Sequence, residues 1–137
     1  MPNKIESHET IIIGAGFSGL GLAMQLFKKN LPCLILERAS DVGGVWRDNT
    51  YPAAACDVPS RLYSYSFAQN TNWSRSFSTQ QEILAYLKSC VENHILSDII
   101  QFNQTVINAN FDAKSGTWMV VCASGTRYTA RFLITAC

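Results

Sequence analysis

Three glycines and one carboxylate near the start of the chain have the types and spacing that bind a diphosphate. Gly14, Gly16 and Gly19 form the pattern G-x-G-x-x-G. The first glycine allows a sharp turn, the second leaves room for a diphosphate beside the backbone, and the third lets a helix pack closely on a strand. Glu37 follows about twenty positions later, where a carboxylate can accept hydrogen bonds from both ribose hydroxyls of an adenosine. These four residues predict a dinucleotide-binding site.

The residues around the glycines predict the strand–helix–strand unit that must position them. The apolar run at residues 10–13 predicts a buried strand, and apolar residues at helical spacing between residues 20 and 27 predict a helix. Asn30 can adopt the left-handed conformation that ends a helix, and the continuous apolar run at residues 33–36 predicts a parallel strand. The alternative is a glycine-rich turn in another α/β protein, with Glu37 at a solvated strand end. The order of strand, helix, cap and acid favours the dinucleotide site.

The composition is that of one folded domain. The chain has 137 residues, of which 47% are hydrophobic and 15% charged, and this balance argues against disorder. A net charge of +1 with scattered basic residues predicts no nucleic-acid partner. The apolar stretch at residues 11–27 is short for a membrane span. Glu6 and Glu9 precede it in place of the basic residues of a signal peptide, so we expect neither a span nor a signal.

Cysteine and histidine usage predicts a cytoplasmic protein without a metal site. The five cysteines are odd in number and form no C-x-x-C pair, which is typical of reduced thiols rather than a disulfide framework. His8 and His94 stand alone, so no metal-ligand cluster is predicted.

The middle of the chain combines a glycine pair, an aromatic stripe and a helix. The glycines at 43–44 come directly after the strand that ends at the ribose-binding acid, so we expect them to contact a ligand. Aromatic residues alternate over residues 63–67, which predicts a short strand or extended segment, with the rings used for packing. Thr79 with Glu82, or the pair one position earlier, predicts a capping box for a helix that ends at about His94.

The last third of the chain predicts an antiparallel meander joined by short hairpins. One strand is predicted within residues 102–111, and two more are predicted at residues 118–122 and 128–135. In the first of them, Ile107, Ala109 and Phe111 would share one face. Residues 131–135 are strongly apolar, as in a strand that rejoins a buried sheet.

At this point the residues resemble a known family, the class B flavin-dependent monooxygenases, which include the flavin-containing and the Baeyer–Villiger monooxygenases. The resemblance begins at about Glu9 and covers essentially the rest of the chain. It is carried by residues 14–20, 37–38 and 41–46 and, most specifically, by residues 51–52, 56–60 and 62–67. The last three segments resemble the Baeyer–Villiger-like branch more than the branch that oxidises amines and sulfides.

The resemblance implies an α/β, Rossmann-like FAD/NAD(P)-binding domain with a parallel sheet, a βαβ unit and an antiparallel β-meander. In this family NADPH reduces the flavin, O2 adds to it, and one oxygen atom passes to a ketone or a soft nucleophile. The implied cofactor-binding residues are Gly14, Gly16, Phe17, Ser18 and Gly19 at the FAD diphosphate, Glu37 at the adenosine ribose, Arg38, Gly44, Val45 and Trp46 along the cofactor, Asp57 and Tyr63 near the flavin, and the backbone of Val106 at the adenine. Asp57 is the one implied catalytic residue, since the family has there a carboxylate that helps to set an arginine of the other domain.

Two departures from the family pattern bear on function. Ala53 stands where relatives usually have glycine, so that loop is expected to be displaced. The second glycine motif, which would bind NADPH, is absent from residues 1–137. We therefore expect one partial FAD-binding domain without an NADPH-binding domain, inactive alone and with an apolar sheet edge exposed at residues 131–135.

Two other functions compete with this interpretation. The chain could be a non-catalytic FAD- or nucleotide-binding module, or one half of a split flavoprotein whose complementary chain carries the NADPH domain. A disulfide reductase is a third candidate, but that class has a redox cysteine pair soon after the ribose-binding acid. No such pair follows Glu37.

Overall fold

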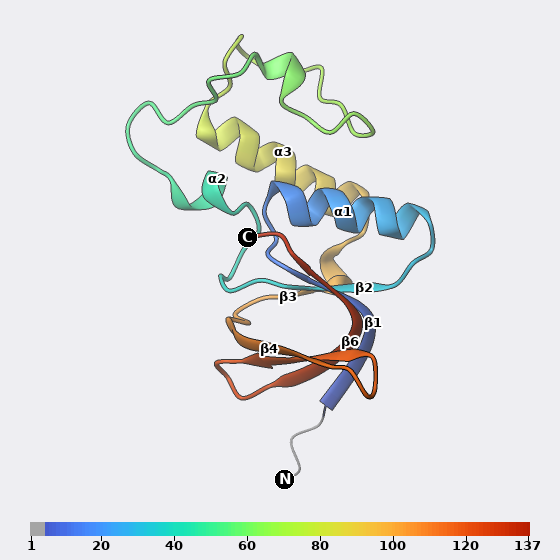
Figure 1. Cartoon of the computed structure of the whole chain (residues 1–137). Helices are drawn as coiled ribbons and strands as arrows, with labels where there is room; N and C mark the ends of the chain where they lie inside the picture. Colours follow the sequence, from blue (N-terminus) through green and yellow to red (C-terminus); the bar gives the residue numbers. More distant parts are fainter. Residues whose placement is uncertain (1–4) are drawn as a thin grey trace.

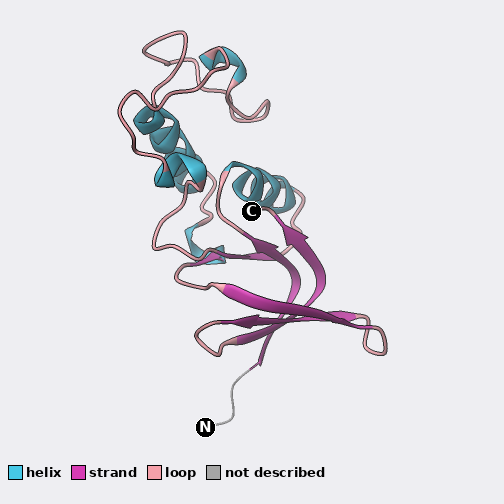
Figure 2. Cartoon of the chain, turned by 60° about the vertical axis from the view of Figure 1, so that its left-hand side comes forward, coloured by secondary structure: helices cyan, strands magenta, loops and turns pink. Residues whose placement is uncertain are grey.

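The structure is a computed structural model that describes residues 5–137. A six-stranded mixed sheet runs in the order β3-β2-β1-β6-β5-β4, and the helices gather on one side of its parallel part (Figures 1 and 2). The elements in chain order are β1 (Ile5–Ile13), α1 (Phe17–Lys28), β2 (Cys33–Leu36), α2 (Val45–Asp48), the 3-10 turn η1 (Ser60–Leu62), α3 (Gln80–Asn93), the 3-10 turn η2 (Ser97–Ile99), β3 (Ile100–Gln101), β4 (Val106–Asp112), β5 (Thr117–Cys122) and β6 (Arg127–Thr135).

The strand–helix–strand unit predicted at the start of the chain is confirmed. β1 pairs in parallel with β2, from Thr10 opposite Cys33 to Ile13 opposite Leu36. All four residues of β2 are buried, as expected for a parallel strand covered on both faces. Asn30 has φ = 56°, the left-handed conformation predicted after the helix.

The long strand β6 joins the meander to the parallel sheet. Its first part pairs antiparallel with β5 as far as Ala130 opposite Trp118, while its whole length pairs in parallel with β1. The prediction that the last strand rejoins the buried sheet is therefore confirmed. Among residues 5–137, no strand pairs with the other edge of residues 131–135, and Phe132 is 49% exposed there. This half of β6 has the open, apolar edge expected from the sequence.

Two apolar cores form on the opposite faces of the sheet, because successive strand residues point to opposite sides. One core lies between the parallel strands and the helices, with Ile12 and Ile35 from the sheet and Leu20 and Leu87 from α1 and α3. The other contains buried strand residues alone, so the meander folds against the parallel strands there. Its members are Ile11, Leu34, Leu36, Val120, Cys122, Tyr128 and Ala130.

The segment at residues 63–67 is not a strand, contrary to the alternation of its aromatic residues. It follows η1 and contains turns, with an isolated bridge between Tyr65 and Ala68. The Tyr86 hydroxyl accepts a hydrogen bond from the Tyr65 N–H at 2.9 Å and donates one to the Ala68 carbonyl at 2.7 Å. The backbone is therefore held by a tyrosine of α3 rather than by a neighbouring strand. The rings are used for packing, as expected, with Tyr65 against Phe17 at a centroid distance of 4.5 Å.

A strand is present within residues 102–111 as predicted, but the face expected for Ile107 is wrong. Residues 100–101 form the separate strand β3, which pairs in parallel with β2 at the edge of the sheet. The chain then turns at Asn103, where φ is 57°, and β4 begins at Val106. The register shifts between Val106 and Asn108, so one extra residue bulges from β4. Ile107 therefore leaves the face it was expected to share and is 63% exposed.

Helix α3 begins as predicted, with half of the capping box. Thr79 is the N-cap, and its hydroxyl accepts a hydrogen bond from the Glu82 N–H at 3.3 Å. The Glu82 carboxylate does not return to Thr79 but accepts hydrogen bonds from the N–H and the hydroxyl of Ser74, at 2.7 and 3.0 Å. This contact ties the preceding loop to the helix, which ends with His94 as its C-cap.

Candidate nucleotide-binding site

The glycine loop joins the carboxyl end of β1 to the start of α1, and two of its glycines are required by close packing. A Cβ at Gly19 would lie 1.9 Å from the carbonyl oxygen of Gly14, so the helix could not approach the strand with any larger residue. Gly14 has φ = 105°, and a Cβ there would lie 2.8 Å from the carbonyl oxygen of Ala136. The predicted packing role of the third glycine is confirmed. The loop is also held against the last residues of the chain, which the sequence did not indicate.

The second glycine faces the glycine pair that follows β2. A Cβ on Gly44, where φ is 54°, would lie 3.1 Å from the Cα of Gly16. Gly16 is the N-cap of α1 and forms no side-chain capping bond, so the first N–H groups of the helix are not satisfied by a cap. Two glycine-rich turns therefore approach each other closely at the positive end of a helix dipole.

A cavity of about 590 Å³ opens at the carboxyl ends of β1 and β2, a size that fits a small-molecule ligand. The predicted cofactor-binding residues that line it are Gly14, Gly16, Phe17, Ser18, Glu37, Arg38, Gly44, Val45 and Val106. Further lining residues, not expected from the sequence, are Arg47, Asp48, Gln104, Thr105, Ala136 and Cys137. The cavity therefore brings together the first turn of α1, the tip of β2, the start of β4 and the end of β6.

The remaining predicted residues lie outside the lining of this cavity. Gly19 is buried beneath the loop. The Trp46 indole N–H donates a hydrogen bond to the Tyr63 hydroxyl at 3.1 Å, and the Tyr63 ring packs edge-on against Phe17 at 5.1 Å. Trp46 and Tyr63 therefore support Phe17, which does line the cavity. Asp57 is exposed and forms no ion pair with any residue among 5–137.

Glu37 is 4% exposed and connects the tip of β2 to the glycine loop. Its Oε2 accepts a hydrogen bond from the Ala15 N–H at 2.7 Å, and its Oε1 accepts one from the Ala39 N–H at 2.9 Å. A buried carboxylate needs such donors, because burying an unpaired charge is costly. The carboxylate therefore holds the loop in place as well as lining the cavity.

Arg47 is the main polar residue of the cavity that the sequence analysis missed. Its Nη1 donates to Oε1 of Glu37 at 3.2 Å and to the carbonyl oxygen of Asp41, while its Nε donates to Asp48 Oδ1 at 2.8 Å. The hydrogen bond to Asp48 and the charge of Glu37 raise the pKa of Arg47. The sequence did contain a signal for this pair: Arg47 follows the glycine pair closely, and Glu37 at the end of β2 is a carboxylate that needs a cation.

Asp41 and Lys88 connect the loop that carries the glycine pair to α3. The Lys88 Nζ lies 2.6 Å from Asp41 Oδ2, and both side chains are 44% exposed. Burial acts to raise the pKa of Asp41, but the hydrogen bonds from Lys88 and from the Val42 N–H outweigh it and lower the pKa. The glycine pair is thus held from both sides, by Arg47 toward the sheet and by this ion pair toward the helix.

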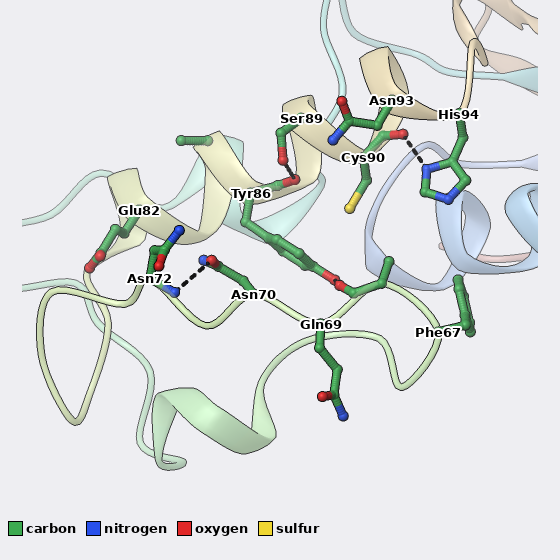
Figure 3. A pocket seen from close by; sticks show the side chains of 12 residues that line it. Phe67, Gln69, Asn70, Asn72, Glu82, Tyr86, Ser89, Cys90, Asn93 and His94 are labelled. Atoms are coloured by element: carbon green, nitrogen blue, oxygen red, sulfur yellow. Dashed lines mark hydrogen bonds between the residues drawn. The ribbon is translucent and has the colours of Figure 1, made fainter.

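A second cavity, of about 510 Å³, lies between α3 and the loop that precedes it (Figure 3). Its polar groups pair largely with one another, as Asn72 N–H does with Asn70 Oδ1 at 3.0 Å and His94 Nδ1 with the Cys90 carbonyl at 3.0 Å. Across residues 5–137 the side chains form no cluster suited to a metal ion. No helix in that part of the chain is long and apolar enough to cross a membrane.

Comparisons with known proteins agree with this geometry. The family model for the NAD(P)-binding Rossmann-like domain matches residues 12–79. A Baeyer–Villiger monooxygenase of Streptomyces coelicolor is 43% identical over 135 residues, which is 97% of this chain and 26% of the relative. An uncharacterized monooxygenase of Mycobacterium tuberculosis is 53% identical over 102 residues, 74% of this chain and 20% of the relative. The chain thus spans about a quarter or less of the length of these curated relatives.

Solved structures of monooxygenases share the fold. A steroid monooxygenase bound to NADP superposes with a TM-score of 0.91 at 40% identity, over 95% of this chain and 26% of that one. Cyclohexanone monooxygenase in a closed form gives a TM-score of 0.91 at 30% identity, over 97% of this chain and 26% of that one. The chain is therefore a homologue of the Baeyer–Villiger and FAD-binding monooxygenases, with a Rossmann-like α/β fold that is partial relative to theirs.

Proposed function

We propose that the chain binds FAD by its adenosine diphosphate half and is the FAD-binding portion of an NADPH- and O2-dependent monooxygenase. Such an enzyme would insert oxygen into ketones or soft nucleophiles. The observation that supports the proposal is the single cavity shared by the glycine loop, Glu37 and Val106. The homology to proteins named as Baeyer–Villiger and FAD-binding monooxygenases supports the same conclusion.

Each wall of the cavity has a proposed role in binding. The uncapped N-terminus of α1, with Gly14, Gly16 and Ser18, would hold the diphosphate through backbone N–H groups and the positive end of the helix dipole. Glu37 would accept hydrogen bonds from the ribose hydroxyls, and the backbone of Val106 would contact the adenine. Bound FAD would supply the redox and oxygen-transfer chemistry, while these residues bind and orient it.

The flavin half of FAD would lie toward Trp46, Tyr63 and Asp57. Trp46 is hydrogen-bonded to Tyr63, and the Tyr63 ring packs against Phe17, so the three rings form an aromatic wall beside the loop. Asp57 is exposed and without a cationic partner among residues 5–137, so its carboxylate could orient a cation from another segment. This is the role proposed for it in catalysis.

The alternative function is a nucleotide-binding module or one half of a split flavoprotein. The observation that favours it is the open edge of β6 at residues 131–135, which could accept a strand from a complementary chain that carries the NADPH site. Co-purification of such a chain, with activity restored on mixing, would support the split protein. Tight FAD binding with no partner and no turnover would support the module.

Calorimetry with FAD, ADP and FMN tests the binding proposal. We expect FAD and ADP to bind with similar affinity and FMN to bind at least tenfold more weakly, because FMN lacks the adenosine diphosphate half. Equal binding of FMN, or no binding of ADP, would refute the proposed site. With NADPH and a ketone added, the 137-residue chain should form no oxygenated product, and sustained turnover would refute the claim that it is inactive alone.

Cys137 offers an independent probe of the same cavity. It is the exposed cysteine, whereas Cys33, Cys56, Cys90 and Cys122 are buried. Burial also raises the pKa of the Cys33, Cys90 and Cys122 thiols, which slows their alkylation. Iodoacetamide should therefore modify Cys137 first, and saturating ADP should slow that reaction at least tenfold. An unchanged rate with ADP bound would place the nucleotide elsewhere.

A further inference from the structure

We propose that a third cavity, distant in sequence from the glycine loop, binds a phosphate monoester group. The cavity measures about 320 Å³. The residues that line it belong to η1 and to the long loop between α2 and α3, and Figure 1 shows the path of that loop. The walls of the cavity are two chain segments, residues 59–61 and residues 71–76. The lining residues are Pro59, Ser60, Arg61, Thr71, Trp73, Arg75 and Ser76.

Six of the seven residues that line this cavity, all except Pro59, have a side chain that can donate a hydrogen bond. Arg61 and Arg75 lie on opposite walls, and Thr71 and Ser76 also line the cavity. No acidic residue lines the cavity, and neither arginine forms an ion pair within residues 5–137. A guanidinium presents a planar fork that binds phosphate oxygens in pairs. Two such forks without a carboxylate partner suit a phosphate dianion.

Hydrogen bonds join the two walls, so the backbone that carries the two arginines is held in place. The Ser60 N–H donates to the Ser76 carbonyl at 2.7 Å, and the Ser60 hydroxyl donates to the Arg75 carbonyl at 2.7 Å. The Ser78 hydroxyl donates to that of Ser60 at 2.6 Å, and these two serines are 0% and 2% exposed, respectively. Only the long arginine side chains remain to be ordered on binding, which lowers the entropic cost.

Trp73 supplies a second, independent observation. It lines the cavity, and its indole Nε1 is buried without a hydrogen-bond partner. Buried polar groups are rarely left unpaired in folded proteins, so an orphan donor needs an explanation. An anion oxygen bound in this cavity would be an acceptor of the required kind.

This site differs from the proposed FAD cavity in how it would hold an anion, and it does not depend on that proposal. The FAD cavity offers backbone N–H groups at a helix end, and its two arginines, Arg38 and Arg47, are paired with carboxylates, whereas the two arginines of this cavity form no ion pair among residues 5–137. The cavity of Figure 3 differs as well, since its lining includes the Glu82 carboxylate and no arginine. Inorganic phosphate and the phosphate of a nucleotide share the chemistry required, so the test must separate them.

The indole N–H signal of Trp73 in 15N NMR is the readout, assigned with Trp73→Phe. The chain is titrated with inorganic phosphate, adenosine 2′-monophosphate and adenosine. Both phosphate compounds should shift the Trp73 signal, and tighter binding of the nucleotide would identify it as the source. A shift caused by adenosine, or no shift with either phosphate compound, would overturn the proposal.

Arginine variants distinguish a local phosphate site from a general attraction of anions to basic residues. Arg61→Gln and Arg75→Gln should each weaken phosphate binding at least fivefold, and the lysine variants should restore only part of it. Arg127→Gln is the matched control, since Arg127 is exposed on β6 and forms no ion pair among residues 5–137. Equal weakening by Arg127→Gln would show that the effect is not local and would overturn the proposal. Melting temperatures confirm that all variants are folded.

Discussion

The guanidinium of Arg47 lies 3.2 Å from the carboxylate of Glu37, where the loop after β1 meets the loop after β2 beside the nucleotide cavity. The side chains are 16% and 5% exposed, so this ion pair is largely shielded from water. Arg47 also binds Asp48 and the carbonyl of Asp41, and Glu37 binds the N–H of Ala15. The pair therefore sets the glycine pair and the glycine loop relative to each other.

Arg47→Gln should lower the free energy of unfolding by about 2 kcal/mol, because it leaves a buried carboxylate without its cation. The loss stays below that of a fully buried pair, since Glu37 keeps two backbone N–H donors. Urea unfolding followed by circular dichroism measures the difference. Arg38→Gln is the control: its side chain is 73% exposed, so the change should be within about 0.5 kcal/mol. Equal losses in the two variants would show that the buried pair has no special role.

Gly19→Ala should be strongly destabilising, by about 3 kcal/mol or more, because the new methyl group would lie 1.9 Å from a backbone carbonyl. The backbone cannot move away without separating α1 from β1. Gly116→Ala is the matched variant, since a Cβ there meets nothing within 4 Å and only the positive φ of 67° causes strain. It should cost about 1 kcal/mol. A loss for Gly19→Ala no larger than this would contradict the packing role of the third glycine.

Ala53→Gly should stabilise the fold by about 0.5 to 1 kcal/mol. Ala53 has φ = 65°, a conformation that strains any residue with a Cβ, so the backbone there keeps a shape that suits glycine. Ala113→Gly provides the comparison, because Ala113 is exposed in a turn and is not among the residues with positive φ. That change should destabilise by about 0.5 kcal/mol through the greater freedom of the unfolded chain. Thermal unfolding of both variants measures the change in stability, which should be positive for Ala53→Gly and negative for Ala113→Gly.

Lys88→Gln should remove a pH-dependent part of the stability. The pKa of Asp41 is lower in the folded chain than its usual value of 3.8, so its ion pair stabilises the fold above that value. The contribution is lost as the pH falls through the lowered pKa. We expect a difference of about 0.5 kcal/mol between wild type and variant at pH 7, small because both side chains are 44% exposed. As the pH falls through the lowered pKa, the two unfolding curves should converge, and a constant difference would rule out this pair as the cause.

Much of the fold was predictable because its signals are local. Helix α3 was recognisable from its apolar spacing and from Thr79 as N-cap. The strand–helix–strand unit was recognisable because each element is a continuous run of a few residues. Prediction failed at Tyr65, where the backbone N–H donates a hydrogen bond to the hydroxyl of Tyr86 on α3, and at Ile107, where a bulge changes the face of β4.

The sequence by itself determined the kind of site: the glycine spacing and the acid at Glu37 require a tight turn, a close helix and a carboxylate at a strand tip. Only the tertiary structure decided which residues complete it. Arg47 reaches Glu37, and Ala136 closes on Gly14, because parallel strands distant in the sequence end at one edge of the sheet. Contacts of this kind depend on the pairing of β6 with β1, which no local pattern of residues specifies.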